Sequence, residues 1–137
     1  MKSIKASDVI RDKLLEAGGT ATVYLLQGEP FDVTITPDHK AFETRKIPGY
    51  NYGFEVFDVV LDLLHEKGGS ARKGNGRSYK LGQSGCELDT IVGAIGERYW
   101  RKTVGESVFD PVFVLGAILE WAEICHNERG FLELWKH

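Results

Sequence analysis

The sequence has little cysteine and little proline, with two and four residues respectively among 137. Cys86 and Cys125 stand far apart and form no CxxC pair, which excludes a disulfide framework. We expect both to be reduced thiols. A long apolar run is also lacking, since the longest, residues 112–119, is far shorter than the roughly 20 residues that span a bilayer. We therefore expect no membrane partner.

An excess of one charge is missing as well. The formal net charge is −3, which excludes a strong overall attraction to nucleic acid but leaves room for a local basic patch. The first residues carry charge but no apolar segment of the kind found in secretory signals, so a cytoplasmic protein is expected. Hydrophobic content of 42% and charged content of 27% are ordinary for a globular chain, and the length suits one domain, residues 1–137.

The first third of the chain reads as a helix followed by strands. Ser7 is a predicted N-cap for a helix that runs to about residue 17 and ends at two glycines. Stretches 20–26, 31–36 and 41–47 are rich in β-formers or alternate apolar and polar residues, with turn residues between them. This pattern predicts a three-stranded antiparallel sheet, and residues 1–47 form the first lobe.

Residues 48–53, rich in proline, glycine and tyrosine, are interpreted as a linker to a helical lobe at 54–137. Apolar residues at steps of three and four predict a helix over 54–67. Ser84 and Glu87 have the spacing of a capping box for a helix to about 102, and Asp110 precedes a proline at the expected start of a helix to 127. Residues 131–135 fit either a short strand or a packed tail. The fold class is α+β: an N-terminal helix and three-stranded sheet packed with a C-terminal three-helix region.

The segment 68–85 contains four basic residues, no acidic residue and six glycines. Asn75-Gly76 favours a type I′ turn, because both residues tolerate the positive φ which that turn needs. The sequence therefore predicts either a basic hairpin or a loop that contacts an anion. The candidate anion-binding residues are Arg72, Lys73, Arg77 and Lys80.

Other kinds of site fit the sequence less well. The glycines of 69–76 lack the Lys and Ser or Thr of a phosphate loop. Cys86 in the first turn of a helix would be an activated nucleophile, although no histidine base can be assigned to it. The pairs Asp62 with His65 and Glu123 with His126 resemble metal-ligand spacing but continue polar helix faces. No metal or cofactor is expected.

Three hypotheses for function follow. The first is a non-enzymatic binding protein whose basic segment contacts nucleic acid or another anion. The second is a structural or regulatory homo-oligomer, in which apolar residues of the last helix and tail pack against a second copy. The third is a small enzyme built on a Cys86 nucleophile.

Overall fold

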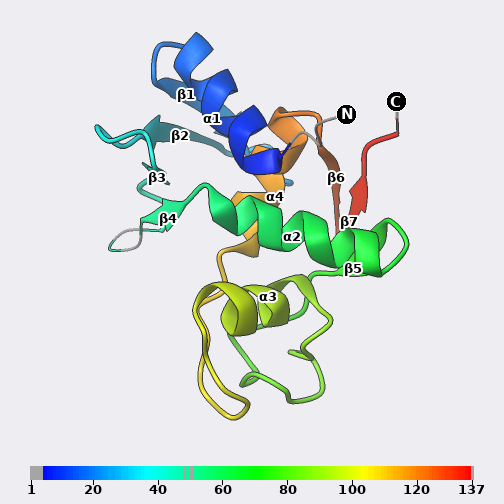
Figure 1. Cartoon of the computed structure of the whole chain (residues 1–137). Helices are drawn as coiled ribbons and strands as arrows, with labels where there is room; N and C mark the ends of the chain where they lie inside the picture. Colours follow the sequence, from blue (N-terminus) through cyan, green and yellow to red (C-terminus); the bar gives the residue numbers. More distant parts are fainter. Residues whose placement is uncertain (1–4, 48, 50, 137) are drawn as a thin grey trace.

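The structure is a computed structural model that describes residues 5–47, 49 and 51–136. It is an α+β fold with antiparallel pairing throughout its two sheets. In Figure 1, helix α2 (Glu55–Glu66) crosses the middle of the molecule, with α1 (Ala6–Glu16) and the first sheet on one side. The short helix α3 (Ile91–Ala94) and the loops that flank it lie on the other side.

Helix α1 begins at the expected place, but its cap differs from the prediction. Ser7 lies inside the helix, and the residue before the helix, Lys5, makes no side-chain capping bond. Instead the Ser7 amide donates to Oδ1 of Asp58 on α2 at 3.0 Å. A carboxylate from a packed neighbour thus satisfies a first-turn amide that a local side chain was expected to satisfy.

The first sheet has the order β1-β2-β3-β4, formed by β1 (Thr20–Tyr24), β2 (Pro30–Ile35), β3 (Ala41–Glu43) and β4 (Tyr52–Gly53). The hairpin of β1 and β2 and the addition of β3 confirm three predicted strands. Residues 52–53, at the end of the expected linker over 48–53, form a fourth strand. Phe42 and Tyr52 pair across β3 and β4, and both are fully buried. Pro48 and Tyr50 lie outside the described residues.

The expected helix from residue 86 begins later. Thr90 is the N-cap of α3, accepting the Gly93 amide at 3.1 Å, and Glu87 instead accepts the Gly85 amide. The helix continues as a π-helical stretch, η1 (Ile95–Tyr99). The Tyr99 hydroxyl accepts the Gly53 amide at 2.8 Å, so the π-helical stretch is tied to β4.

The predicted third helix of the C-terminal region ends six residues early. Helix α4 (Val112–Trp121) stops where Glu123 adopts a φ of 59°, and a second sheet follows. Its order is β5-β7-β6, from β5 (Ser70–Arg72), β6 (Cys125–Glu128) and β7 (Phe131–Leu134). Burial alternates along β6, with Cys125 and Asn127 inside. The C-terminal region therefore has its three expected helical segments, but residues 125–128 form a strand of a second sheet where the last helix was expected to continue.

One continuous core joins both lobes. Its fully buried members include Ile10 of α1, Phe57 of α2 and Leu115 of α4. Leu132 of the second sheet is equally buried. Most apolar residues of α4, on which the homo-oligomer hypothesis relied, thus pack within the chain itself, whereas Phe131 of β7 is 37% exposed.

Candidate anion-binding site

The basic segment follows β5 as a loop and does not form a hairpin with itself. Arg72 pairs with Phe131 of β7, and the next amide, that of Lys73, donates to the Gly130 carbonyl at 2.8 Å. Residues 77–80 form turns and not a return strand. The expected type I′ turn is absent as well, because neither Asn75 nor Gly76 has a positive φ. Residues 70–72, which would have formed the first strand of the hairpin, pair instead with β7 in the second sheet.

Gly74 is where the chain leaves the sheet. Its φ is 76°, in the left-handed region that favours glycine. A Cβ at this position would lie 2.6 Å from Oγ1 of Thr90 and 2.8 Å from a methyl carbon of Val92. Lys73 is held from the other side, since its carbonyl accepts the Val92 amide at 3.0 Å. This close approach fixes the backbone of Lys73 against the start of α3.

The Asn75 side chain organises the turn that follows. Its Oδ1 accepts the amides of Arg77 and Ser78, each at 3.0 Å, so the turn is an Asx-type turn. The Gly76 amide donates to Oδ2 of Asp110 at 3.1 Å. The backbone at Gly76 and Arg77 is therefore held by two side-chain acceptors, Asp110 and Asn75.

Asp110 joins this loop to α4. Its second oxygen, Oδ1, accepts the amide of Val112, the first residue of α4, at 3.1 Å. The N-cap of that helix is Pro111, one residue after the expected position, Asp110. Each carboxylate oxygen of Asp110 thus already accepts a backbone amide. The only acidic side chain that lines the cavity described next is engaged in holding its walls.

The loop and α4 enclose a surface cavity of about 350 Å³. Its lining includes Gln27, Lys73, Gly74, Arg77, Asp110 and Phe113. The guanidinium carbon of Arg77 lies 5.5 Å from the centroid of the Phe113 ring, which is cation–π distance. Two of the four predicted basic residues therefore meet in one concave place.

Lys73 is half-buried in this cavity. Burial lowers the pKa of its ammonium, against the opposite influence of the carboxylates of Asp110, Glu120 and Glu128. Among the residues that the structure describes, no carboxylate lies within ion-pair distance of Lys73 or Arg77, and the Lys73 ammonium makes no hydrogen bond. The cavity therefore holds two cations without a direct counter-ion.

The other two predicted residues lie elsewhere. Arg72 points at Glu87 across 3.6 Å, with 65% of its side chain exposed. Lys80 is exposed in a turn closed by its amide and the Gln83 side chain, outside the cavity lining. The basic segment is thus not a continuous track of free cations. Sequence reasoning missed Gln27 and Phe113, since nothing in the sequence links a residue of the first hairpin's turn, or one from α4, to this loop.

The Cys86 hypothesis loses its structural basis. Cys86 precedes α3 by several residues, so it does not lie in a first helical turn. The side chain is fully buried. Burial, with the carboxylates of Asp110 and Glu87, raises the pKa of the thiol, which is the opposite of activation. Cys125 is also buried, and burial raises its pKa to about 12.

The two acid–histidine pairs do not form a metal centre. Asp62, His65 and Glu123 line one groove of about 780 Å³ between α1, α2 and the end of α4. His126 instead stacks on Trp135, with the ring centroids 4.3 Å apart. Within 5–47, 49 and 51–136, no group of three or more His, Cys, Asp or Glu residues has the arrangement to hold a metal ion.

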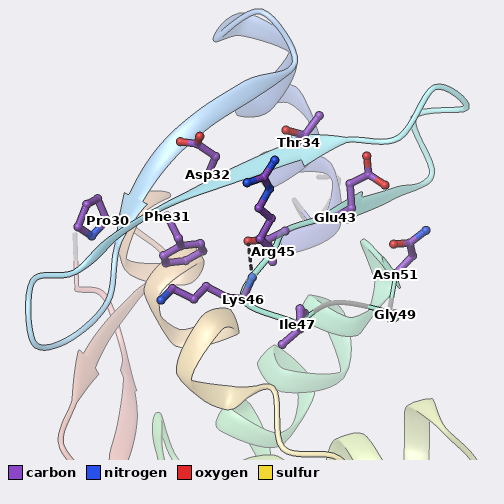
Figure 2. Close-up of a pocket in the computed structure, with 11 residues that line it drawn as sticks. Pro30, Phe31, Asp32, Thr34, Glu43, Arg45, Lys46, Ile47, Gly49 and Asn51 are labelled. Atoms are coloured by element: carbon purple, nitrogen blue, oxygen red, sulfur yellow. Dashed lines mark hydrogen bonds between the residues drawn. The ribbon is translucent and has the colours of Figure 1, made fainter.

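A larger groove of about 830 Å³ lies on the polar face of the first sheet (Figure 2). Asp32, Thr34 and Glu43 project from that face, and Arg45 reaches toward them from the following loop. Lys46, at one side, forms an ion pair with Glu29. Acidic and basic groups balance in this groove, so it offers no preference for an anion.

No helix in the described part of the chain is long and apolar enough to cross a membrane. Comparison with protein-family models, curated proteins and solved structures found no match.

Proposed function

We propose that the protein binds an anionic ligand in the cavity formed by Lys73, Arg77, Gln27 and Phe113. One observation carries the proposal: two cations share a concave site whose lining carboxylate, Asp110, is already bonded to two backbone amides. An incoming anion therefore displaces no carboxylate of the described residues from an ion pair with Lys73 or Arg77.

The energetics favour an anion at Lys73 in particular. A half-buried ammonium has lost part of its hydration without gaining a direct ion pair or hydrogen bond. A carboxylate or phosphate oxygen at hydrogen-bond distance would replace the lost water and favour the charged form. Arg77 adds a planar guanidinium that holds two oxygens of the same anion. Its position over Phe113 limits the rotamers that it must lose on binding.

The geometry suits a single anionic group better than a long phosphate backbone. Arg72 is turned toward Glu87, and Lys80 lies outside the cavity. The carboxylates of Glu120 and Glu128 act on Lys73 from the neighbouring elements and would repel a second phosphate. A terminal phosphate of a nucleic acid and a free small anion present the same chemistry to the cavity, and an experiment can separate the two sources.

The test is calorimetric titration of the protein with inorganic phosphate at low salt. Lys73→Met and Arg77→Gln are each expected to weaken binding about tenfold, since a hydrogen bond to a charged group contributes about 1.5–3 kcal/mol. Lys40→Met is the matched control, because Lys40 is exposed in the turn between β2 and β3, outside the cavity lining. Loss of affinity equal to that of the control would contradict the proposal.

The nucleic-acid source is examined in a second arm with a 5′-phosphorylated single-stranded oligonucleotide and its dephosphorylated form. A cavity that receives one phosphate predicts a preference for the phosphorylated end and little effect of Lys80→Met. If instead Arg72→Gln and Lys80→Met weaken binding as much as Lys73→Met, the ligand is a nucleic-acid backbone that follows the whole basic segment.

A homo-oligomer remains a second candidate, carried by a different observation. Tyr24 and Leu26, at the end of β1, have 61% and 48% of their surface exposed, which is unusual for large apolar side chains so close in sequence. Light scattering over a range of concentrations tests it. A monomer at the highest concentration would remove this candidate.

A further inference from the structure

Lys73 differs from the other well-placed lysines of the chain in having no partner for its ammonium. Lys67 pairs with Asp89 at 2.8 Å, and Lys13 donates to the Trp121 carbonyl at 2.7 Å. Lys46 pairs with Glu29. Lys46 also lies half-buried in a groove, but its ammonium is paired, whereas Lys73 is half-buried beside Arg77 in the lining of its cavity without such a partner.

We propose that Lys73 is a nucleophile that captures an aldehyde or ketone bearing an anionic group, forming an imine while Arg77 holds the anion. This inference rests on the proposed function, because the cavity must first admit an anion. It deepens that function by naming the ligand class: a small carbonyl compound with a carboxylate or phosphate close to the carbonyl carbon.

The surroundings of Lys73 favour the neutral amine that such a reaction needs. Burial lowers its pKa, so a larger fraction of the amine is unprotonated near neutral pH than for an exposed lysine. Three carboxylates act in the opposite direction: Asp110 beside the loop, Glu120 on α4 and Glu128 on β6. Burial prevails over them. Two of the three are exposed, and Asp110 is bonded to the Gly76 and Val112 amides.

The reaction conserves atoms and requires no oxidant or reductant. The ammonium first releases one proton to water. The lone pair of Nζ then attacks the carbonyl carbon, the C–N bond forms, and the carbonyl oxygen takes up a proton to give a carbinolamine. Loss of this oxygen as water, with the second hydrogen supplied from nitrogen, leaves a C=N bond. The step is reversible, because water regenerates the amine and the carbonyl compound.

Arg77 supplies the selectivity in this account. Its guanidinium is positioned by the Phe113 ring at 5.5 Å and by the Asx-type turn at Asn75, so it can hold a carboxylate before the amine attacks. A bound anion raises the local concentration of the carbonyl group next to Nζ. A neutral aldehyde gains nothing from Arg77, and that difference provides the control.

The experiment treats the full chain with glyoxylate, an aldehyde bearing a carboxylate, together with cyanoborohydride, which reduces the imine to a stable secondary amine. Peptide mass mapping then measures the initial rate at each lysine. Lys73 is expected to react severalfold faster than Lys40 and Lys80, both exposed. Acetaldehyde, which lacks the carboxylate, is expected to give Lys73 a much smaller advantage.

Variants make the test specific. Arg77→Gln is expected to remove most of the glyoxylate advantage at Lys73, measured as the ratio of the glyoxylate rate to the acetaldehyde rate in the same variant. Arg45→Gln, which removes an exposed guanidinium from the groove on the first sheet, should change neither rate. The wild-type comparison between lysines needs no variant to fold.

Two results would overturn the proposal: glyoxylate modifies Lys73 no faster than Lys40, or the advantage of Lys73 persists in Arg77→Gln. In the first case, phosphate binding that still depends on Arg77 would leave the anion site standing and remove only the imine. Absence of both phosphate binding and selective labelling would remove both proposals together.

Discussion

Asp110 holds Gly76 and Val112 at once, accepting the amide of the first through Oδ2 and of the second through Oδ1, each at 3.1 Å. One carboxylate therefore fixes the tip of the basic loop against the first residue of α4. Asp110 is also the acidic side chain in the lining of the cavity between these two elements, where it forms no ion pair with Lys73 or Arg77. The anion-binding proposal depends on this arrangement.

Replacing Asp110 tests that arrangement directly. In Asp110→Ala two partly buried amides lose their acceptor, and we expect a loss of about 2 kcal/mol in the free energy of unfolding, measured by urea denaturation. Asp110→Asn keeps one carbonyl oxygen and should lose less. Equal stability of the wild type and the alanine variant would show that neither hydrogen bond matters.

Gly74 is expected to tolerate no side chain. In Gly74→Ala a left-handed φ of 76° is combined with a Cβ only 2.6 Å from Thr90, so the variant should lose about 2–4 kcal/mol of stability. Gly105→Ala is the matched control, because Gly105 has a φ of 97° and open space around its missing Cβ. It should lose about 1–2 kcal/mol. Equal losses for the two variants would contradict a steric role of Thr90.

Substitutions of Asn75 test the effect of loop geometry on stability separately from the effect of charge on anion binding. Asn75→Asp retains the oxygen that accepts the Arg77 and Ser78 amides, so we expect the free energy of unfolding to change by less than about 0.5 kcal/mol. It also places a negative charge beside the cavity, so phosphate affinity should fall. Asn75→Ala removes that acceptor without adding charge, so the free energy of unfolding should fall by about 1 kcal/mol. If Asn75→Asp binds phosphate as the wild type does, Arg77 does not supply the binding energy.

Lys73 predicts a specific dependence of stability on pH. Its pKa is lower in the folded chain than its ordinary value of 10.5, so between the two values the unfolded chain binds more protons. Stability contributed by this residue therefore rises with pH through that window and is constant below it. Cys125 acts with the opposite sign, because its pKa is raised from 9.0 to about 12 and stability falls as the unfolded thiol ionises.

The comparison with a variant isolates the lysine. Urea denaturation of the wild type and Lys73→Met is measured at a series of alkaline pH values, and the difference between the two stabilities should move in favour of the wild type as pH rises. Lys40→Met should show no such trend. A pH-independent difference for Lys73→Met would mean that Lys73 is not desolvated in the folded chain.

Local patterns predicted much of the fold. The hairpin of β1 and β2 follows from alternation between turn residues, and the helix over residues 55–66 follows from apolar residues at steps of three and four. Failures arose where distant residues decide the outcome. Ser7 is capped by Asp58, which lies 51 positions away in sequence. Cys125–Glu128 extends as a strand because β7 offers a ladder and the core accepts its alternate side chains.

The candidate site was predictable only in part, for the same reason. Residues 68–85 were predicted to bind an anion because they contain four basic residues and no acidic residue. The sequence does not reveal that Arg72 meets Glu87, nor that Phe113 lies under Arg77. The expected turn at Asn75 and Gly76 failed because its flanking strand paired with β7 and Asp110 took the Gly76 amide. Tertiary partners therefore selected which of the four basic residues share the cavity.

The most direct test of the anion site is an amide NMR titration of the wild type with inorganic phosphate at low salt. The account predicts saturable shifts centred on Lys73, Gly74, Arg77 and Phe113, which disappear in Arg77→Gln and persist in Lys40→Met. Shifts confined to other regions, or a response in Arg77→Gln equal to that of the wild type, would contradict it.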